Sequence, residues 1–474
     1  VLSGRLDRAD AGAGPTAEPA VAVRQKGTHM HDMQLDSEQV AATAAEAFVF
    51  GYPLVLMALT RDQMTAVSTP DGVQAPVNHF GHTREYQDAS PRGLVGPNAD
   101  TLYSSAWLDL SAEPVVLSVP DTAGRYYLMP MLDAWTNVFS SPGSRTTGNG
   151  PGQFGIVGPH WRDPLPDGVR KIRSPTNMAW IIGRVQASGP NDYEAARIVQ
   201  DGLRLTPLSQ LGRRERPPHP ASVDPDVDLA TKPVDQVSRM PPVVFFGMLA
   251  KLLVDNPCRA ADQPMVDRMA GVGIRPGEPL DWSTLDEPTR EALERGTRQG
   301  LATVVAEGRT PRGELRNGWT LSYDLGEYGT YYARRAGVAW VGLGANHAED
   351  AVYGLSRTDS DRQPYTGRHR YVLHFETGAV PPVRAFWSLT MYDEQQRFVP
   401  NPINRYAIGD RDDLRFNPNG SLDIHIQHDP PGRGREPNWL PAPQDAFNLV
   451  LRMYWPERTI LSRAWSPPAV RRVR

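Results

Sequence analysis

The sequence predicts a mainly β fold with helical additions, of the α+β class, in which two antiparallel β-sandwich or jelly-roll-like domains are joined by a helical section. Three observations predict this arrangement. Apolar residues alternate with a period of two in many short segments on both flanks of the chain. Between these flanks they recur with a period near 3.6, which is typical of helices. The 45 prolines and 42 glycines are spread along the whole chain, which suits many short strands and turns.

The first expected element is a helix that begins at Ser37, whose hydroxyl can cap it. It is expected to end near Gly51 or, after a kink at Pro53, near Met64. From residue 102 the period changes to two and Gly/Pro turns recur roughly every ten residues, as in an antiparallel sandwich or barrel. The expected strands cover residues 103–110, 115–119, 126–132, 137–140, 154–157, 170–173 and 178–185.

The middle of the chain is expected to be helical, and the C-terminal part β-rich again. Residues 206–240 contain paired prolines and show no periodicity, so they are predicted to be a linker. Helices are expected over residues 192–203, 243–254, 264–270 and 288–307. A short helix or strand is expected over residues 339–343, followed by clearer strands over residues 371–375, 385–392, 424–427 and 448–454.

These elements group into four stretches of chain. Residues 1–34 are rich in Ala, Gly and charge and are expected to be a disordered tail or an upstream extension. An N-terminal β-rich domain with the opening helix is expected over residues 35–205. A linker and helical section over residues 206–318 and a C-terminal β-sandwich domain over residues 319–474 complete the expected organisation.

Composition and charge argue against several kinds of partner. A net charge of −4 and a pI near 6.3 provide no basic field for a nucleic acid or an anionic membrane. No run of about eighteen apolar residues occurs, so no membrane span is expected. An acidic stretch rather than a basic one precedes the apolar residues 47–59, so no signal peptide is visible and a cytoplasmic location is favoured. The single Cys258 excludes an internal disulfide and a cysteine-rich metal site.

The segment from Asn98 to Tyr103 is the first candidate site. Asn98 and Asp100, two residues apart, favour a turn in which side chains bond the backbone just before a strand. That turn alone is one interpretation of the segment. In the other interpretation, Asp100 and Tyr103 project from the strand into a cleft as catalytic residues, and Asn98 binds the ligand.

Asp133, Trp135 and Asn137 form the second candidate site. Residues two apart share one face of a strand, so a carboxylate, an indole and an amide would form one surface. Such a surface can bind a ligand, with Asp133 as a potential base, although a polar strand edge is the alternative. Because antiparallel strands bring starts and ends together, we expect these three side chains to meet Asp100 and Tyr103 at the mouth of the N-terminal sheet.

Tyr328, Tyr331 and Arg334 form the third candidate site. Phenols beside a guanidinium suit a carboxylate, a phosphate or a sugar, because arginine can bind planar anions through two hydrogen bonds. An ordinary interdomain seam is the alternative. Pockets often form where domains meet, so we expect these residues, together with Trp439, to complete the same cleft from the C-terminal side.

Several of these segments resemble paired bacterial domain families of unknown function, numbered 1254 for the N-terminal member and 1214 for the C-terminal member. The resemblance to the first family rests on Asn98, Asp100, Thr101 and Tyr103 and on the segment from Asn78 to Arg84 upstream of them. The resemblance to the second rests on residues 327–334 and 438–443. It covers most of residues 37–457 and implies a two-domain architecture without implying a reaction.

Known catalytic signatures are absent from the sequence. It contains no nucleophile elbow, phosphate-binding loop, dinucleotide-binding fingerprint or His-Glu-x-x-His motif. No cofactor and no metal site are therefore expected. One functional hypothesis is an enzyme acting on a small molecule or a glycan, as a hydrolase or lyase, through a cleft of carboxylates, tyrosines and arginines. The other is a non-catalytic binding or envelope-assembly protein that uses its sandwich surfaces, and both leave homo-oligomerisation open.

Overall fold

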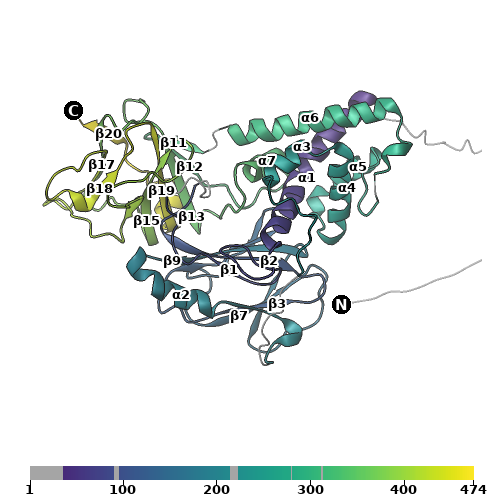
Figure 1. Ribbon diagram of the computed structural model, residues 1–474, viewed down its shortest axis with the longest axis horizontal. Helices are drawn as coiled ribbons and strands as arrows, with labels where there is room; N and C mark the ends of the chain where they lie inside the picture. The colour runs from purple at the N-terminus through teal and green to yellow at the C-terminus, as the bar shows by residue number, and fades with distance from the viewer. Residues whose placement is uncertain (1–35, 90–95, 214–221, 279, 311–312, 474) are drawn as a thin grey trace, which may run out of the picture.

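The computed structural model describes residues 36–89, 96–213, 222–278, 280–310 and 313–473. In Figure 1 the N-terminal sandwich lies below, with the C-terminal sandwich and a helical layer side by side above it. Several antiparallel sheets and helices are present, so the predicted α+β class with two β-rich domains joined by a helical section is confirmed. The expected tail over residues 1–34 lies outside the described residues.

The N-terminal sandwich consists of one six-stranded and one four-stranded sheet. The larger sheet has the order β1 (Gly81–His82), β2 (Thr101–Asp109), β9 (Met178–Gln186), β5 (Met131–Asp133) and β6 (Val138–Ser140), and β4 (Tyr127–Leu128) pairs with β9 off this path. The smaller sheet has the order β10 (Arg204–Pro207), β3 (Val115–Val119), β7 (Gly152–Val157) and β8 (Val169–Arg173). The strand expected over residues 126–132 is split at Pro130, because proline cannot donate to a strand ladder.

The helical layer is built around one long helix. Helix α1 (Ser37–Thr65) begins with Asp36, not Ser37, as its cap: the Asp36 carboxylate accepts from the backbone of Gln39, and the Gln39 side chain accepts from the backbone of Asp36. The helix continues through Pro53. Around it lie α3 (Pro233–Arg239), α4 (Pro242–Asp255), α5 (Gln263–Gly271), α6 (Glu287–Arg309) and α7 (Tyr332–Val341), while α2 (Tyr193–Gly202) lies on the N-terminal sandwich.

Helix α1 is long and apolar enough to cross a membrane by length and composition, although no uninterrupted run of about eighteen apolar residues occurs in it. Inside the protein, however, 78% of its most apolar window is buried. Its side chains share one apolar core with α4, α5 and α6 and with Trp107 and Trp180 of the N-terminal sheet. The apolar surface of α1 is therefore satisfied by protein contacts.

The C-terminal sandwich repeats the same architecture. Its six-stranded sheet has the order β11 (Glu314–Arg316), β12 (Trp319–Ser322), β13 (Ala351–Ser356), β19 (Phe447–Pro456), β15 (Val383–Asp393) and β16 (Ala407–Gly409). The four-stranded sheet has the order β18 (Trp439–Pro441), β17 (Leu422–Gln427), β14 (Arg370–Phe375) and β20 (Val470–Val473), and α8 (Arg458–Leu461) follows β19. In each sandwich the smaller sheet includes one parallel pair, β7–β8 and β17–β18, which departs from a purely antiparallel arrangement.

In both six-stranded sheets one face fills the core of its sandwich, and the other face carries the polar side chains of the candidate site. On β2 and β9, Leu102 and Val185 point into the N-terminal sandwich core, so their neighbours Tyr103 and Arg184 point to the opposite face. On β19, Leu451 and Met453 fill the C-terminal core, so Arg452 between them points outwards. The outer faces of the two sheets are turned towards each other and towards the end of the helical layer.

The contact between α1 and α6 provides a test of the helical layer. A Cβ atom at Gly296 would lie 2.3 Å from the carbonyl oxygen of Ala41 and 2.6 Å from the Cβ of Ala44. Gly296→Ala is therefore expected to lower the free energy of unfolding by about 1–3 kcal/mol, because the helices must separate. Chemical denaturation monitored by circular dichroism measures the change.

The matched control is Gly247→Ala on α4, where nothing lies within 4 Å of the added Cβ. This substitution is expected to stabilise the protein by up to about 1 kcal/mol, since alanine favours a helix over glycine. If Gly296→Ala behaves like Gly247→Ala, the close approach of α1 and α6 is wrong.

Candidate functional site

A cavity of about 500 Å³ lies where the N-terminal sandwich, the helical layer and the C-terminal sandwich meet. One wall comes from the outer faces of the two six-stranded sheets, and the other comes from α7 and the segment after it. The sheet wall is polar and aromatic and presents Asn98, Tyr103, Arg184, Tyr353, Arg452 and Tyr454. The volume of the cavity falls within the range of small-molecule sites.

Arg184 and Arg452 are the buried charges of this wall. Each lies on a central strand, and the strand register places Arg184 opposite Tyr103 and Arg452 opposite Tyr353. The exposed fractions of the two arginines are only 6% and 7%. The guanidinium carbon of Arg184 lies 5.3 Å from the ring centroid of Tyr103, and that of Arg452 lies 5.9 Å from the ring centroid of Tyr353. Such cation–π contacts stabilise a guanidinium without neutralising it.

Both guanidinium groups are hydrogen-bonded to neutral oxygens. Arg184 Nη1 donates to the Ile182 carbonyl at 3.2 Å and to Asn346 Oδ1 at 3.1 Å, and its Nε is buried without a partner. Arg452 donates to Thr390 Oγ1 at 2.6 Å and to Tyr392 Oη at 2.5 Å.

Within the described part of the chain, neither guanidinium forms an ion pair. Asp100 acts electrostatically on Arg452, but both of its oxygens are already engaged by Arg411 and Ser388. The site therefore carries unbalanced positive charge. Burying an unpaired charge costs several kcal/mol of stability.

Two asparagines orient the tyrosines beside these arginines. Asn98 Oδ1 accepts from the backbone N–H groups of Asp100 at 3.0 Å and Thr101 at 2.8 Å, which fixes the amide orientation. The Asn98 amide nitrogen then donates to Tyr103 Oη at 2.6 Å.

Asn346 makes a similar arrangement with Tyr353. Its oxygen accepts from Arg184, and its nitrogen donates to Tyr353 Oη at 3.2 Å. In both pairs the phenol oxygen of Tyr103 or Tyr353 is an acceptor, so its own hydrogen can be donated to a molecule in the cavity.

The protonation states of the wall favour an anionic occupant. Burial lowers the pKa of Arg184 and Arg452, but neighbouring tyrosines, joined by Asp100 at Arg452, outweigh this effect and raise both pKa values above the ordinary arginine value. Burial also raises the pKa of Tyr454 well above 10.0. The arginines therefore remain charged and Tyr454 remains a neutral hydrogen-bond donor at neutral pH.

Asp100 holds the two sandwiches together behind this wall. It is fully buried, forms an ion pair with Arg411 and accepts from Ser388 Oγ at 2.8 Å. Arg411 Nη1 also donates to the Asp100 carbonyl at 3.1 Å, and Tyr392 donates to the Pro97 carbonyl. The turn before β2 is thus fixed by residues of β15 and of the loop after β16.

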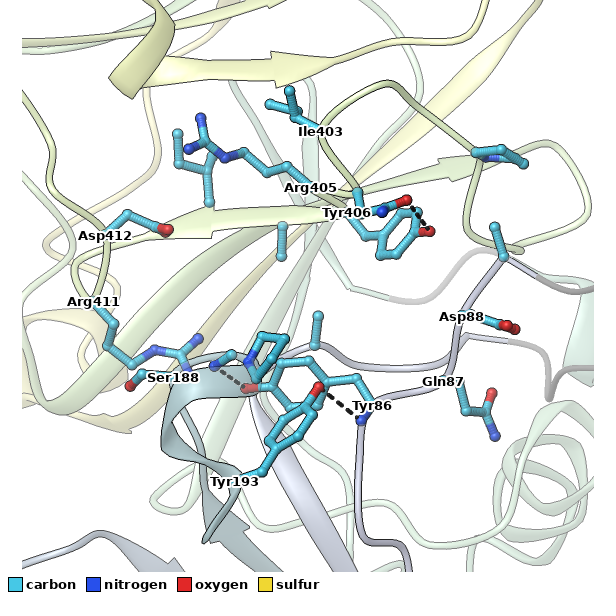
Figure 2. Close-up of a pocket in the computed structure, with 18 residues that line it drawn as sticks. Tyr86, Gln87, Asp88, Ser188, Tyr193, Ile403, Arg405, Tyr406, Arg411 and Asp412 are labelled. Atoms are coloured by element: carbon cyan, nitrogen blue, oxygen red, sulfur yellow. Dashed lines mark hydrogen bonds between the residues drawn. The ribbon is translucent and has the colours of Figure 1, made fainter. Parts of the chain in front are cut away.

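A second cavity, of about 740 Å³, is lined by Arg411 together with Tyr86, Tyr193, Arg405 and Asp412 (Figure 2). Three of its charged side chains already have partners within the protein, although Arg411 Nε is buried without one. Arg411 is paired with Asp100, Arg405 donates to three backbone carbonyls, and Asp412 accepts from the Gly409 backbone at 2.7 Å. The buried arginine of this cavity thus has an ion pair, whereas Arg184 and Arg452 form none with the described residues.

Comparison with known proteins identifies the two sandwiches. Residues 77–207 match the family model described as "Protein of unknown function (DUF1254)", and residues 350–458 match "Protein of unknown function (DUF1214)". The chain joins a DUF1254 domain to a DUF1214 domain. The matched segments contain Asn98, Tyr103, Arg184, Tyr353 and Arg452, so both segments contribute to the cavity of this chain.

A solved structure resembles this chain in fold, and a second one aligns with it more weakly. The VPA0106 protein from Vibrio parahaemolyticus has 24% sequence identity and a TM-score of 0.69, with 92% of this chain and 100% of that chain covered. An uncharacterized protein from Burkholderia cenocepacia has 13% identity and a TM-score of 0.42, with 92% of both chains covered. No curated protein matches the sequence.

The expected meeting of Asp133 with Asp100 is wrong. Asp133 lies opposite Ala179 of β9, whereas Asp100 precedes Thr101, which lies opposite Gln186. The span of β9 between these positions is about 23 Å at roughly 3.3 Å per residue. Both β2 and β5 are antiparallel to β9, so they run in the same direction: Asp100 precedes one strand while Asp133 ends the other.

Asp133, Trp135 and Asn137 also do not share a strand face, because β5 ends at Asp133. The Asp133 carboxylate accepts from the backbone N–H groups of Trp135 at 2.9 Å and Asn137 at 2.8 Å, so it stabilises a tight turn. The Trp135 ring packs in the helical core, 4.7 Å from the ring centroid of Phe50. These residues lie at the other end of the DUF1254 sheet from the cavity.

The third candidate group is brought only partly to the cavity. Arg334 lines it and pairs with Asp324 at 2.6 Å. Tyr331 is 76% exposed, Tyr328 is buried beside Gly326, and Trp439 is buried in the smaller C-terminal sheet. Tyr328 and Tyr331 precede α7, and the DUF1214 match begins only after Arg334, at residue 350.

Sequence reasoning missed the two buried arginines. Arg184 interrupts the apolar strand Met178–Gln186, and Arg452 interrupts the apolar strand Phe447–Pro456. An arginine inside a buried apolar run is rare unless it has a specific partner or function. That signal was present in the sequence. By contrast, Asn346, Ser388 and Arg411 lie in segments whose spatial neighbours only the fold reveals.

The new position of Asp133 leads to a prediction about stability. Asp133→Ala is expected to lower the free energy of unfolding by at least about 2 kcal/mol, because two buried backbone N–H groups lose their acceptor. Asp133→Asn is expected to retain stability, since its amide oxygen still accepts and its nitrogen can donate to Asn137 Oδ1 after that amide turns. Asn137 Oδ1 is buried and lacks a partner in the wild type. Denaturant titration of both variants measures the difference.

The pH dependence of stability provides an independent check on the role of Asp133. Burial raises the pKa of Asp133 above 3.8, so the folded protein binds more protons than the unfolded chain above that pH. This component of stability is present at lower pH and is lost as pH rises through the folded pKa, and Asp133→Asn removes it. A wild-type melting temperature for Asp133→Ala would show that the turn does not depend on this carboxylate.

Proposed function

We propose that the protein binds a small molecule with an anionic group in the cavity between its two sandwiches. The observation that carries the proposal is the pair of buried arginines, Arg184 and Arg452, that face one cavity without an ion pair among the described residues. A bound carboxylate or phosphate would balance this charge. Arginine recognises such groups through short, charge-assisted hydrogen bonds.

The tyrosines complete a binding site for an anion. Tyr103 and Tyr353 each accept from an asparagine and so have a hydroxyl hydrogen to donate. Their positions on opposite sheets suit donation to one group held between the two sandwiches. The site thus supplies positive charge and neutral donors to the same ligand.

The geometry supports recognition better than hydrolysis by two carboxylates. Asp100 is occupied by Arg411 and Ser388, and Asp133 stabilises a turn at the far end of β5. A two-carboxylate mechanism needs its acids within about 10 Å of each other. Tyr103 remains at the cavity, where its role in this proposal is to donate a hydrogen bond. An assembly role through outer sandwich surfaces would leave the buried charge unexplained.

The test compares benzoate with its neutral isostere benzamide. Wild-type protein is expected to bind benzoate more tightly than benzamide, and Arg184→Met and Arg452→Met are each expected to weaken benzoate binding by about tenfold or more. Without ligand, both variants are expected to keep or raise the melting temperature, because methionine replaces an unpaired buried charge. Isothermal titration calorimetry and thermal melts provide the two measurements.

Arg298→Met is the matched control. Its side chain lies on α6, is 68% exposed and pairs with Glu294. This variant has the same charge change and is expected to bind benzoate as the wild type does. Equal loss in all three variants would indicate non-specific electrostatics, and no loss in Arg184→Met and Arg452→Met would contradict the proposal.

A further inference from the structure

The wall of the cavity opposite the buried arginines is apolar. It consists of the second half of α7 and the segment after it, with Val338, Val341, Leu343 and Ala345, and Leu325 adds to it. Among the described residues of α7 and the segment after it that line the cavity, Arg334 at the start of α7 is the charged one, and Glu307 of α6 lies beside Gly337. The cavity therefore has a charged end and an apolar side.

The segment after α7, which forms part of the apolar wall, packs directly against β9 near the charged end of the cavity. Gly344, at a φ of +92°, lies so close to β9 that an added Cβ would be 2.5 Å from the Cδ1 atom of Ile182. Ile182 is two residues from Arg184, on the same face of the strand. Only a residue without a side chain fits there, so the segment after α7 lies directly against the strand that carries Arg184.

The cavity opens at the end of α7. Val341 is 67% exposed although it lines the cavity, and Gly342 and Thr310, which also line it, are exposed. Glu307, one turn before Thr310 on α6, lines the same end. An apolar path therefore leads from the buried arginines to the surface, where the polar groups at the end of α6 form the rim.

We infer that the ligand is an amphiphile whose anionic head lies between Arg184 and Arg452 and whose unbranched apolar tail follows α7 towards Val341. This inference rests on the proposed function, since the head group is the anion proposed there. A neutral sugar would leave the arginines unbalanced and place hydroxyls against the valines. A small inorganic anion would leave the apolar wall in contact with water.

The experiment uses alkyl carboxylates and phosphates below their micelle-forming concentrations. For wild-type protein, affinity is expected to rise by about fourfold for each methylene added from butyrate to octanoate. Octyl phosphate distinguishes a phosphate head from a carboxylate head, and octanol lacks the charge. Octanol is expected to bind about tenfold or more weakly than octanoate, as loss of a charged hydrogen bond predicts.

Variants of the apolar wall test how much the ligand's tail contributes to affinity, independently of its anionic head. Val338→Asn and Val341→Asn are expected to flatten the dependence on chain length while butyrate binds as to the wild type. Val254→Asn is the control, because Val254 is 57% exposed on α4 and does not line the cavity. Thermal melts confirm that each variant is folded.

The outcomes distinguish the anion site of the proposed function from the apolar tail proposed for the ligand. A wild-type chain-length dependence that the wall variants reduce, with butyrate affinity kept, supports the amphiphile. Arginine-dependent binding of anions with no dependence on chain length, or with a dependence that the wall variants leave unchanged, overturns the tail and leaves the anion site. Equal binding of octanoate and octanol, insensitive to Arg184→Met and Arg452→Met, overturns the proposed function and the amphiphile together.

Discussion

The buried ion pair between Asp100 and Arg411 is the contact on which the relative placement of the two sandwiches depends. It joins the turn before β2 to the loop after β16, and Ser388 adds a hydrogen bond to the same carboxylate. The same turn contains Asn98, which orients Tyr103. Removal of either charged partner would leave a buried charge uncompensated, and the cavity wall would lose its alignment.

The cavity follows from the way that each larger sheet uses both of its faces. One face of each sheet closes a sandwich core. The other face of the N-terminal sheet packs against helices in one region and against the C-terminal sheet in another. Trp107 and Trp180 stack in the helical region, with their ring centroids 4.7 Å apart. Tyr103 and Arg184 lie further along the same strands. Where the helical layer ends, the two outer faces meet and enclose polar side chains. Unbalanced positive charge at that junction lowers stability, and such a cost is common at functional sites.

The sequence was sufficient for the fold class and for most strands, because periodicity and turn residues are local signals. It was insufficient for the site, which depends on which strand ends lie together. Asp100 was recognised as important, yet its partner Arg411 lies more than three hundred residues away and no pattern joins them. The grouping of Asp133 with Asp100 failed because the strand order, β2-β9-β5, makes β2 and β5 parallel in direction. Arg184 and Arg452 were accessible in principle, as charges inside apolar strands.

The most direct test of the account is a crystal structure of the protein soaked in iodide, with the ion located by its anomalous scattering. The account predicts an iodide ion between the guanidinium groups of Arg184 and Arg452, within reach of the Tyr103 and Tyr353 hydroxyls, and its absence from the same place in Arg452→Met crystals. Iodide confined to surface lysines and arginines, with the cavity empty of anion in the wild type, would contradict the central claim that this junction is an anion-binding site.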